Sequence, residues 1–153
     1  MASTEVKDFL NKQVATLGVL YYRLHQFHWY VMGPHFFTLH EKFEELYDET
    51  TANLDEVAER LLAIGGQPYS TLSEYLEHSV IEENIEDKNL TAEEMVQAVI
   101  DDFETIRTSL QEGIELTDEH GDYPSNDLLI VMKEGIDKHL WMLRAFLGKE
   151  TEA

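Results

Sequence analysis

Hydrophobic residues in the first part of the chain repeat with the period of an α-helix. Six of them recur at alternating steps of four and three residues, which places them on one helix face. They are Leu10, Val14, Leu17, Tyr21, Leu24 and Val31. We therefore expect a helix from about residue 5 until the Gly33-Pro34 pair, because proline cannot continue a helix. Position 28 falls in the same series, although its residue is a histidine.

A second segment with the same periodicity follows this break. Thr38 and Glu41 have the spacing of a capping box, so the helix is predicted to begin there. The pair Gly65-Gly66, followed by Pro68, is predicted to end it. The predicted buried face comprises Leu39, Phe43, Leu46, Leu54, Val57 and Leu61.

The next region begins with a short helical piece and continues as a long connection. Thr71 and Glu74 have the spacing of another capping box, and this short helix is expected to end near His78. Residues 82–88 are acidic and weakly apolar. This composition indicates a long crossing over the surface rather than a packed helix.

Two long helices complete the chain. Thr91 with Glu94 caps the first, which continues to Gly121. A turn at residues 122–125 is expected to lead into the last helix, for which Gly148 is the predicted stop. Two helical hairpins joined by one long crossing predict an all-α fold. This fold is a ferritin-like four-helix bundle with a short extra helix in the long crossover between helices two and three.

The composition narrows the classes of function. The length of 153 residues suits a single ferritin-like domain, residues 1–153. The net charge of −20 disfavours binding to bare nucleic acid or to an anionic membrane, and it favours multivalent cations. The absence of cysteine excludes disulfides, thiolate metal ligands and thiol catalysis. The longest apolar run, residues 128–132, is far too short to span a membrane, and no secretory signal pattern is present, so we expect a cytoplasmic location.

Two pairs of potential metal ligands lie on the second helix. His40 with Glu44, and Asp55 with Glu59, are each one helical turn apart. At about 100° per residue, all four side chains fall in one sector roughly 100° wide. Glu44 and Asp55 are nevertheless about 16 Å apart along the axis, at a rise of about 1.5 Å per residue. A single helix therefore cannot bring both pairs to one metal cluster.

The two pairs are placed symmetrically about the midpoint between residues 49 and 50. The residue numbers 40 and 59 add to 99, and so do 44 and 55. If this helix lies antiparallel to a second copy across a two-fold axis, His40 faces Glu59 of the partner subunit and Glu44 faces Asp55 of the partner subunit. Two equivalent sites then form, each shared between two subunits.

His28, on the neighbouring first helix, is a candidate to complete each shared site. Two imidazoles and three carboxylates suit Fe(II), Mn(II) or Zn(II), and the excess of carboxylates favours iron. Each ligand pair also has an ordinary interpretation as a solvated helix face, and His28 as a core histidine with a satisfied hydrogen bond. The Glu-x-x-His motif that builds a di-iron centre inside a bundle is absent, so an intra-bundle centre of that pattern is not expected.

Several sequence blocks resemble the Dps family, the mini-ferritins of bacteria. The blocks are residues 28–30, 36–41, 55–60, 63–66 and 138–141, and they extend the resemblance over nearly the whole chain. The resemblance implies a hollow homo-oligomeric shell of twelve subunits with tetrahedral symmetry. It also implies oxidation of Fe(II), preferably by hydrogen peroxide, at di-iron centres shared between two subunits, with the ferric product stored inside.

The resemblance also assigns the iron ligands. It carries over His28, His40, Glu44, Asp55 and Glu59 as the catalytic and metal-binding residues. The acidic pair with His28 of the partner subunit would hold the tighter iron, and His40 with Glu44 the weaker one. Position 44 departs from the family, in which aspartate is usual. The glutamate here has one more methylene, which can change how fully the weaker iron position is occupied.

Two further sets of residues follow from the resemblance. Trp29 matches a family aromatic that is proposed to intercept radicals, and filling a subunit interface is the alternative role. Asp118, Asp122 and Asp127 match a negatively charged iron-entry pore at a three-fold axis, where a ring of acids attracts Fe(II). The ordinary interpretation is that Asp127 complements a helix N-terminus and that the remaining acids lie in a solvated turn.

DNA binding is not expected from this chain. Many Dps proteins bind DNA through a lysine-rich terminal tail, but the N-terminal segment here offers only Lys7 and Lys12. We therefore predict a ferroxidase and iron-storage protein that protects against oxidative damage. The alternatives are a structural, nucleoid-compacting shell with vestigial metal sites and a protein that buffers zinc or manganese without redox turnover.

Overall fold

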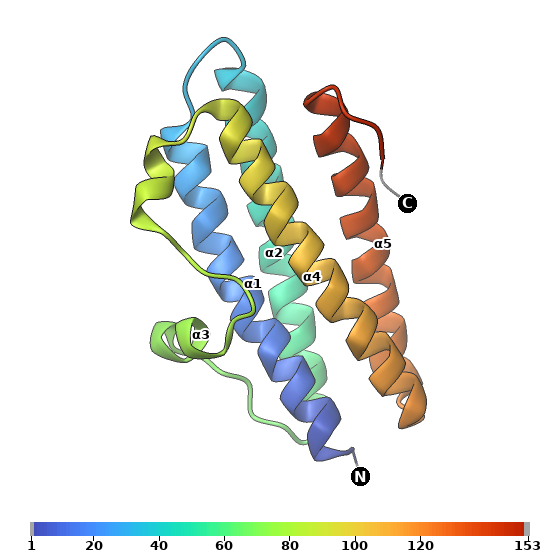
Figure 1. Ribbon diagram of the computed structural model, residues 1–153. Helices are drawn as coiled ribbons and strands as arrows, with labels where there is room; N and C mark the ends of the chain where they lie inside the picture. Colours follow the sequence, from blue (N-terminus) through green and yellow to red (C-terminus); the bar gives the residue numbers. More distant parts are fainter. Residues whose placement is uncertain (1, 152–153) are drawn as a thin grey trace.

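The computed structural model describes residues 2–151, and four long helices form its bundle (Figure 1). Two shorter helical pieces lie in the crossover between the second and third long helices. In chain order the elements are α1 (Thr4–Tyr30), α2 (Phe36–Ala63), α3 (Leu72–His78), the 3₁₀ helix η1 (Ile85–Asn89), α4 (Ala92–Glu119) and α5 (Tyr123–Phe146). The predicted all-α bundle with a short extra helix in the crossover is confirmed.

The long helices pair as two antiparallel hairpins, α1 with α2 and α4 with α5. The crossover carries the chain along the whole length of the bundle, so that α2 and α4 run in the same direction (Figure 1). Both α3 and η1 lie against α1. None of the helices within residues 2–151 has an apolar stretch long enough to cross a membrane.

The apolar faces predicted from the sequence meet in one core. Each long helix contributes side chains that are fully buried, and these stabilise the bundle through the hydrophobic effect. Among them are Leu10, Leu24, Phe27, Phe43, Leu46, Leu61, Met95, Ile106, Leu110 and Leu129. Two members of the predicted faces, Tyr21 and Leu54, are only partly buried.

The start of α2 differs from the prediction of a capping box at Thr38, which is wrong. The helix already begins at Phe36, and its N-cap residue His35 makes no side-chain capping hydrogen bond. Gly33 adopts a φ of 112°, and its carbonyl accepts a 3.1 Å hydrogen bond from the backbone N–H of Phe36. The Phe36 ring stacks on the imidazole of His40 one turn later, with 5.0 Å between centroids. This contact favours helical geometry from Phe36 onward.

The start of α5 also differs from the prediction of a turn at residues 122–125, which is wrong as well. Asp122 is the N-cap, and Pro124 lies in the first helical turn. Proline is tolerated there because the first N–H groups of a helix have no intrahelical partner.

The capping boxes at the starts of α3 and α4 are confirmed. The side chains of Thr71 and Thr91 each accept a hydrogen bond from the backbone N–H three residues later, and the glutamate at that position returns one. The acidic crossing contains η1, which was not predicted. Its start is capped by Asn84, whose side chain accepts a hydrogen bond from the backbone of Glu86.

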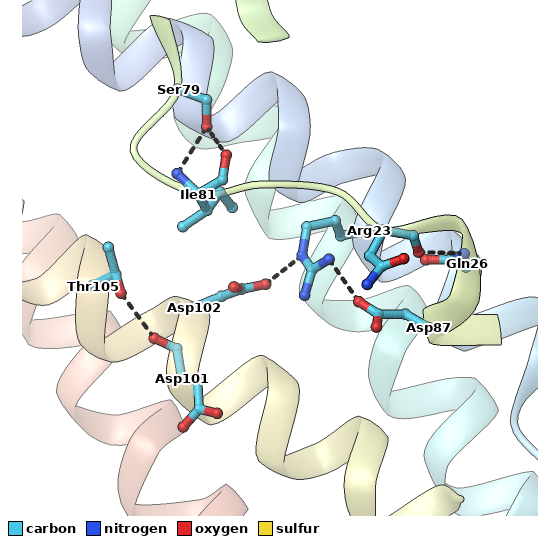
Figure 2. Close-up of polar contacts among 9 residues, drawn as sticks. Arg23, Gln26, Ser79, Ile81, Asp87, Asp101, Asp102 and Thr105 are labelled. Atoms are coloured by element: carbon cyan, nitrogen blue, oxygen red, sulfur yellow. Dashed lines mark hydrogen bonds and ion pairs between the residues drawn. The ribbon is translucent and has the colours of Figure 1, made fainter. Parts of the chain in front are cut away.

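A buried arginine fastens the crossover to the bundle (Figure 2). The side chain of Arg23 on α1 is 6% exposed, and it binds Asp102 of α4 at 2.6 Å and Asp87 of η1 at 2.9 Å. Its guanidinium also lies 5.4 Å from the centroid of the Phe27 ring. Burial alone would lower the pKa of Arg23, but the charges and hydrogen bonds of the two aspartates outweigh it and raise the pKa. One cation thereby links α1, η1 and α4.

Candidate metal centre

Two histidines on adjacent helices hold each other in place. Nδ1 of His28, near the end of α1, lies 2.6 Å from the backbone carbonyl of His40, and Nδ1 of His40 lies 2.7 Å from the backbone carbonyl of His28. Because a carbonyl only accepts hydrogen bonds, each Nδ1 carries a proton and donates it. In the neutral rings, the lone pair is therefore on Nε2, which is the atom available to a metal.

The two imidazoles also form a rigid stack. Their centroids are 3.7 Å apart and their planes differ by 12°. His28 is 6% exposed, so its ring is buried in the hairpin, and its Nδ1 hydrogen bond is satisfied as a core histidine requires. The contacts fit the interpretation of His28 as a core residue. Its Nε2 makes no hydrogen bond within residues 2–151 and lies near a carboxylate, and its role as a metal ligand stays a prediction.

That carboxylate belongs to Glu44. Its Oε1 lies 3.8 Å from Nε2 of His28, and the side chain is 53% exposed. The separation is too long for a hydrogen bond. It does admit a cation bound to both atoms at about 2.1 Å from each, which is an ordinary metal–ligand distance. His28 Nε2 and Glu44 Oε1 are thus close enough to share a cation, and the ring of His40 is stacked on that of His28. We call these three residues the ligand cluster, although the side chain of His40 does not reach the same point as the other two.

The second pair of predicted ligands lies elsewhere on the same chain. Asp55 and Glu59 are further along α2 and are both exposed. Within residues 2–151 neither carboxylate makes a hydrogen bond or an ion pair, and no three histidine or acidic side chains come close enough together to hold a metal ion. One chain thus holds the two halves of the predicted ligand set about 16 Å apart, at about 1.5 Å per residue along the helix.

The sequence reasoning predicted Trp29 next to the ligands but missed two other aromatic neighbours, Tyr47 and His25. The hydroxyl of Tyr47 donates a 3.4 Å hydrogen bond to Oε1 of Glu44, and the Tyr47 ring stacks on His25 at 3.7 Å. Desolvation and the negative charge of Glu44 raise the pKa of Tyr47, so the phenol remains a donor. Trp29 is 64% exposed, and its ring lies 5.2 Å from His25. The signal in the sequence was the helical spacing: His25 precedes His28 by three residues, and Tyr47 follows Glu44 by three.

The three predicted pore acids have different surroundings. Asp118 and Asp127 are exposed. Asp122 instead accepts hydrogen bonds from the backbone N–H and the hydroxyl of Ser125, at 3.1 and 2.7 Å. Its carboxylate also forms an ion pair with Arg60 at 3.0 Å. Although burial opposes the shift, these bonds hold the pKa of Asp122 below its ordinary value.

Asp122 therefore caps α5, and Arg60 offsets its charge. The interpretation of Asp127 as the complement of a helix N-terminus is not supported, because the first turn of α5 contains no acidic residue. The assignment of the pore itself stays a prediction.

Comparisons with known proteins identify the family of this fold. The profile of the ferritin-like domain family matches residues 7–153. The DNA protection during starvation protein of Listeria monocytogenes is 52% identical over 147 residues, covering 96% of this chain and 94% of the relative. General stress protein 20U of Bacillus subtilis is 50% identical over 146 residues, covering 95% of this chain and 99% of the relative.

Solved structures give the same result. The X-ray structure of Dps from Listeria monocytogenes superposes with a TM-score of 0.94 at 51% identity, covering 97% of this chain and 96% of that one. A structure of Dps from Listeria innocua soaked with zinc gives a TM-score of 0.91 at 50% identity, covering 95% of this chain and 97% of that one. The chain therefore belongs to the ferritin-like proteins and, within them, to the Dps family.

Proposed function

We propose that the chain is a ferroxidase and iron-storage protein whose oxidation centre is shared between two copies. The observation that carries the proposal is the ligand cluster of His28, His40 and Glu44, with both imidazoles held in the metal-binding tautomer. Asp55 and Glu59 lie in the same sector of α2 at mirrored positions, so that a two-fold axis brings them to the cluster of the partner.

The substrate chemistry follows from this ligand set. Three carboxylates offset most of the charge of two Fe(II) ions, and two neutral imidazoles complete the binding without adding charge. Each Fe(II) loses one electron, and the pair reduces one hydrogen peroxide, with two protons, to two waters. Because both electrons are delivered together, hydroxyl radical is not released. The protein contributes charge, spacing and exclusion of solvent, and the redox chemistry belongs to iron.

We extend the proposal to the assembly. Twelve copies would enclose a space in which the ferric product is stored, and the exposed Asp118 and Asp127 would line the entry pore. A ring of carboxylates at a three-fold axis concentrates negative potential and attracts Fe(II). Asp122 would contribute less to this potential, because its carboxylate is paired with Arg60.

Complementation between two inactive variants tests the shared centre. One variant carries His28→Ala and His40→Ala, and the other carries Asp55→Ala and Glu59→Ala. Each alone is expected to lose oxidation of Fe(II) by hydrogen peroxide. In a co-expressed equal mixture, a site draws its histidines and its acidic pair from different subunits, so about a quarter of the sites regain a full ligand set.

Stopped-flow absorbance of Fe(III) is the measurement, and circular dichroism checks that both variants are folded. Activity of the mixture near a quarter of wild type supports the shared centre. A mixture as inactive as its components contradicts it. Binding of Fe(II) by the wild-type protein without oxidation when peroxide is added would instead identify a metal-buffering protein.

A further inference from the structure

The surface of α2 carries two large apolar side chains that the bundle leaves uncovered. Phe37, in the first turn, is 83% exposed, and Leu62, in the last turn, is 59% exposed. All residues of α2 are described by the structure, and no other large apolar side chain on this helix is exposed. Covering these side chains would remove apolar surface from water, so a partner surface placed over both of them would be stabilised by the hydrophobic effect.

The two residues occupy the sector of the metal ligands. At about 100° per residue, Phe37 and Leu62 lie roughly 60° and 40° from His40, inside the sector that also holds Glu44, Asp55 and Glu59. Their residue numbers, 37 and 62, add to 99, as do those of the ligand pairs. The two-fold axis that brings the ligands together therefore also brings Phe37 of one copy opposite Leu62 of the partner subunit.

Phe37 is in addition connected to the ligand cluster through a column of rings. Its ring contacts that of Phe36 edge-on, with 5.4 Å between centroids. Phe36 stacks on His40 at 5.0 Å, and His40 stacks on His28 at 3.7 Å. A group that covers Phe37 therefore closes the outer end of the column that holds both imidazoles.

We propose that Phe37 and Leu62 form an apolar contact across the dimer axis that closes the outer end of each shared metal centre. The occupant of this surface is a second copy of the same chain, and the contact occurs twice per dimer. The inference rests on the shared centre of the proposed function and adds the residues that seal it. Leu62 lies three residues after Glu59, so the contact adjoins the carboxylate that would face His40.

Disulfide crosslinking tests the contact directly, because the natural chain contains no cysteine. The test protein is the full-length double variant Phe37→Cys with Leu62→Cys. Within one chain the two positions lie about 38 Å apart along α2, at about 1.5 Å per residue, so they cannot form an intramolecular disulfide. Mild oxidation is expected to convert most of the protein to a covalent dimer on a non-reducing denaturing gel.

Three matched controls accompany the double variant. Phe37→Cys alone and Leu62→Cys alone should stay monomeric on the gel, because like positions lie at opposite ends of the antiparallel pair. Phe37→Cys with Glu56→Cys should also stay monomeric, since Glu56 is exposed but lies about 160° from His40 around the helix. If the double variant does not fold, the two single variants are mixed and refolded, and a crosslinked dimer is expected only in the mixture.

The outcomes separate this contact from the proposed function. Crosslinking of the double variant, or of the mixture, but of no control supports the contact, whatever the oxidation activity. Absence of crosslinking, or equal crosslinking in a single variant, overturns it, even if complementation of the metal centre succeeds. As a second measurement, Phe37→Ser is expected to weaken association of the dimer by about tenfold or more, because the apolar area of the ring is no longer buried. An unchanged association constant would also overturn the contact.

Discussion

Replacement of Arg23 by methionine is expected to destabilise the protein strongly. The change keeps most of the apolar volume but removes the cation that binds Asp87 and Asp102, whose side chains are only 17% and 13% exposed. Removal of one partner from a buried ion pair costs about 3–5 kcal/mol, because the other charge stays buried without compensation. We expect a loss in this range in the free energy of unfolding, measured by guanidinium denaturation at fixed protomer concentration.

The loss in the free energy of unfolding caused by Arg23→Met should also depend on pH. Burial raises the pKa of Asp102 even in the presence of Arg23, so the unpaired carboxyl of the variant should take up a proton more readily in the folded state than in the unfolded chain. A carboxyl group whose pKa is raised in the folded state contributes stability that is fully present below the pKa of the unfolded chain. This contribution is lost as the pH rises through the pKa of the folded state. The deficit is therefore largest at pH 7 and smaller near pH 5.

Arg107→Met is the matched control for this prediction. Arg107 also pairs with an aspartate of another helix, Asp137, but the two side chains are 43% and 46% exposed. Exposed ion pairs contribute at most about 1 kcal/mol. The reasoning is refuted if Arg23→Met loses no more stability than Arg107→Met, or if its deficit is the same at pH 5 and pH 7.

Three other predictions concern the acidic surface. Asp122→Asn should lower the melting temperature more at pH 7 than at pH 3. The lowered pKa of Asp122 stabilises the folded state above the pKa of the unfolded chain, and this stability is lost in acid, so an equal loss at both pH values contradicts the prediction. The double variant Asp118→Asn with Asp127→Asn should slow Fe(II) oxidation and weaken its dependence on ionic strength in stopped-flow traces, and Asp122→Asn should change that dependence less. Metal-free protein should leave the mobility of plasmid DNA in a gel unchanged at neutral pH, and retardation would show that the charge of −20 is not decisive.

The helices could be predicted from the sequence because burying one face of each requires a regular apolar period. The ends of the helices were harder to predict where two local sequence signals competed. Thr38 has the spacing of a cap, but the stack of Phe36 on His40 extends the helix beyond it. Pro124 indicated a turn, yet its fixed φ also suits the first turn of a helix, and Asp122 supplies the cap.

In the candidate site, too, the features that follow from residue spacing could be predicted, and the contacts between helices could not. The spacing along α2 predicted which ligands share a sector, because angle and rise follow from residue number alone. The hydrogen bonds between each histidine ring and the opposite backbone could not be predicted, since they depend on how closely α1 approaches α2. For the same reason the contact of Tyr47 with Glu44 was missed. The ligands contributed by a partner stay a prediction.

The mutual anchoring of His28 and His40 has a consequence for protein engineering. Each ring is oriented by a main-chain oxygen of the other residue, and no substitution of a side chain can delete that acceptor. The helical hairpin thus holds two imidazoles that are already oriented with Nε2 free to bind a metal. Transplanted into an unrelated helical scaffold, it would need only carboxylates placed opposite to become a new binding site.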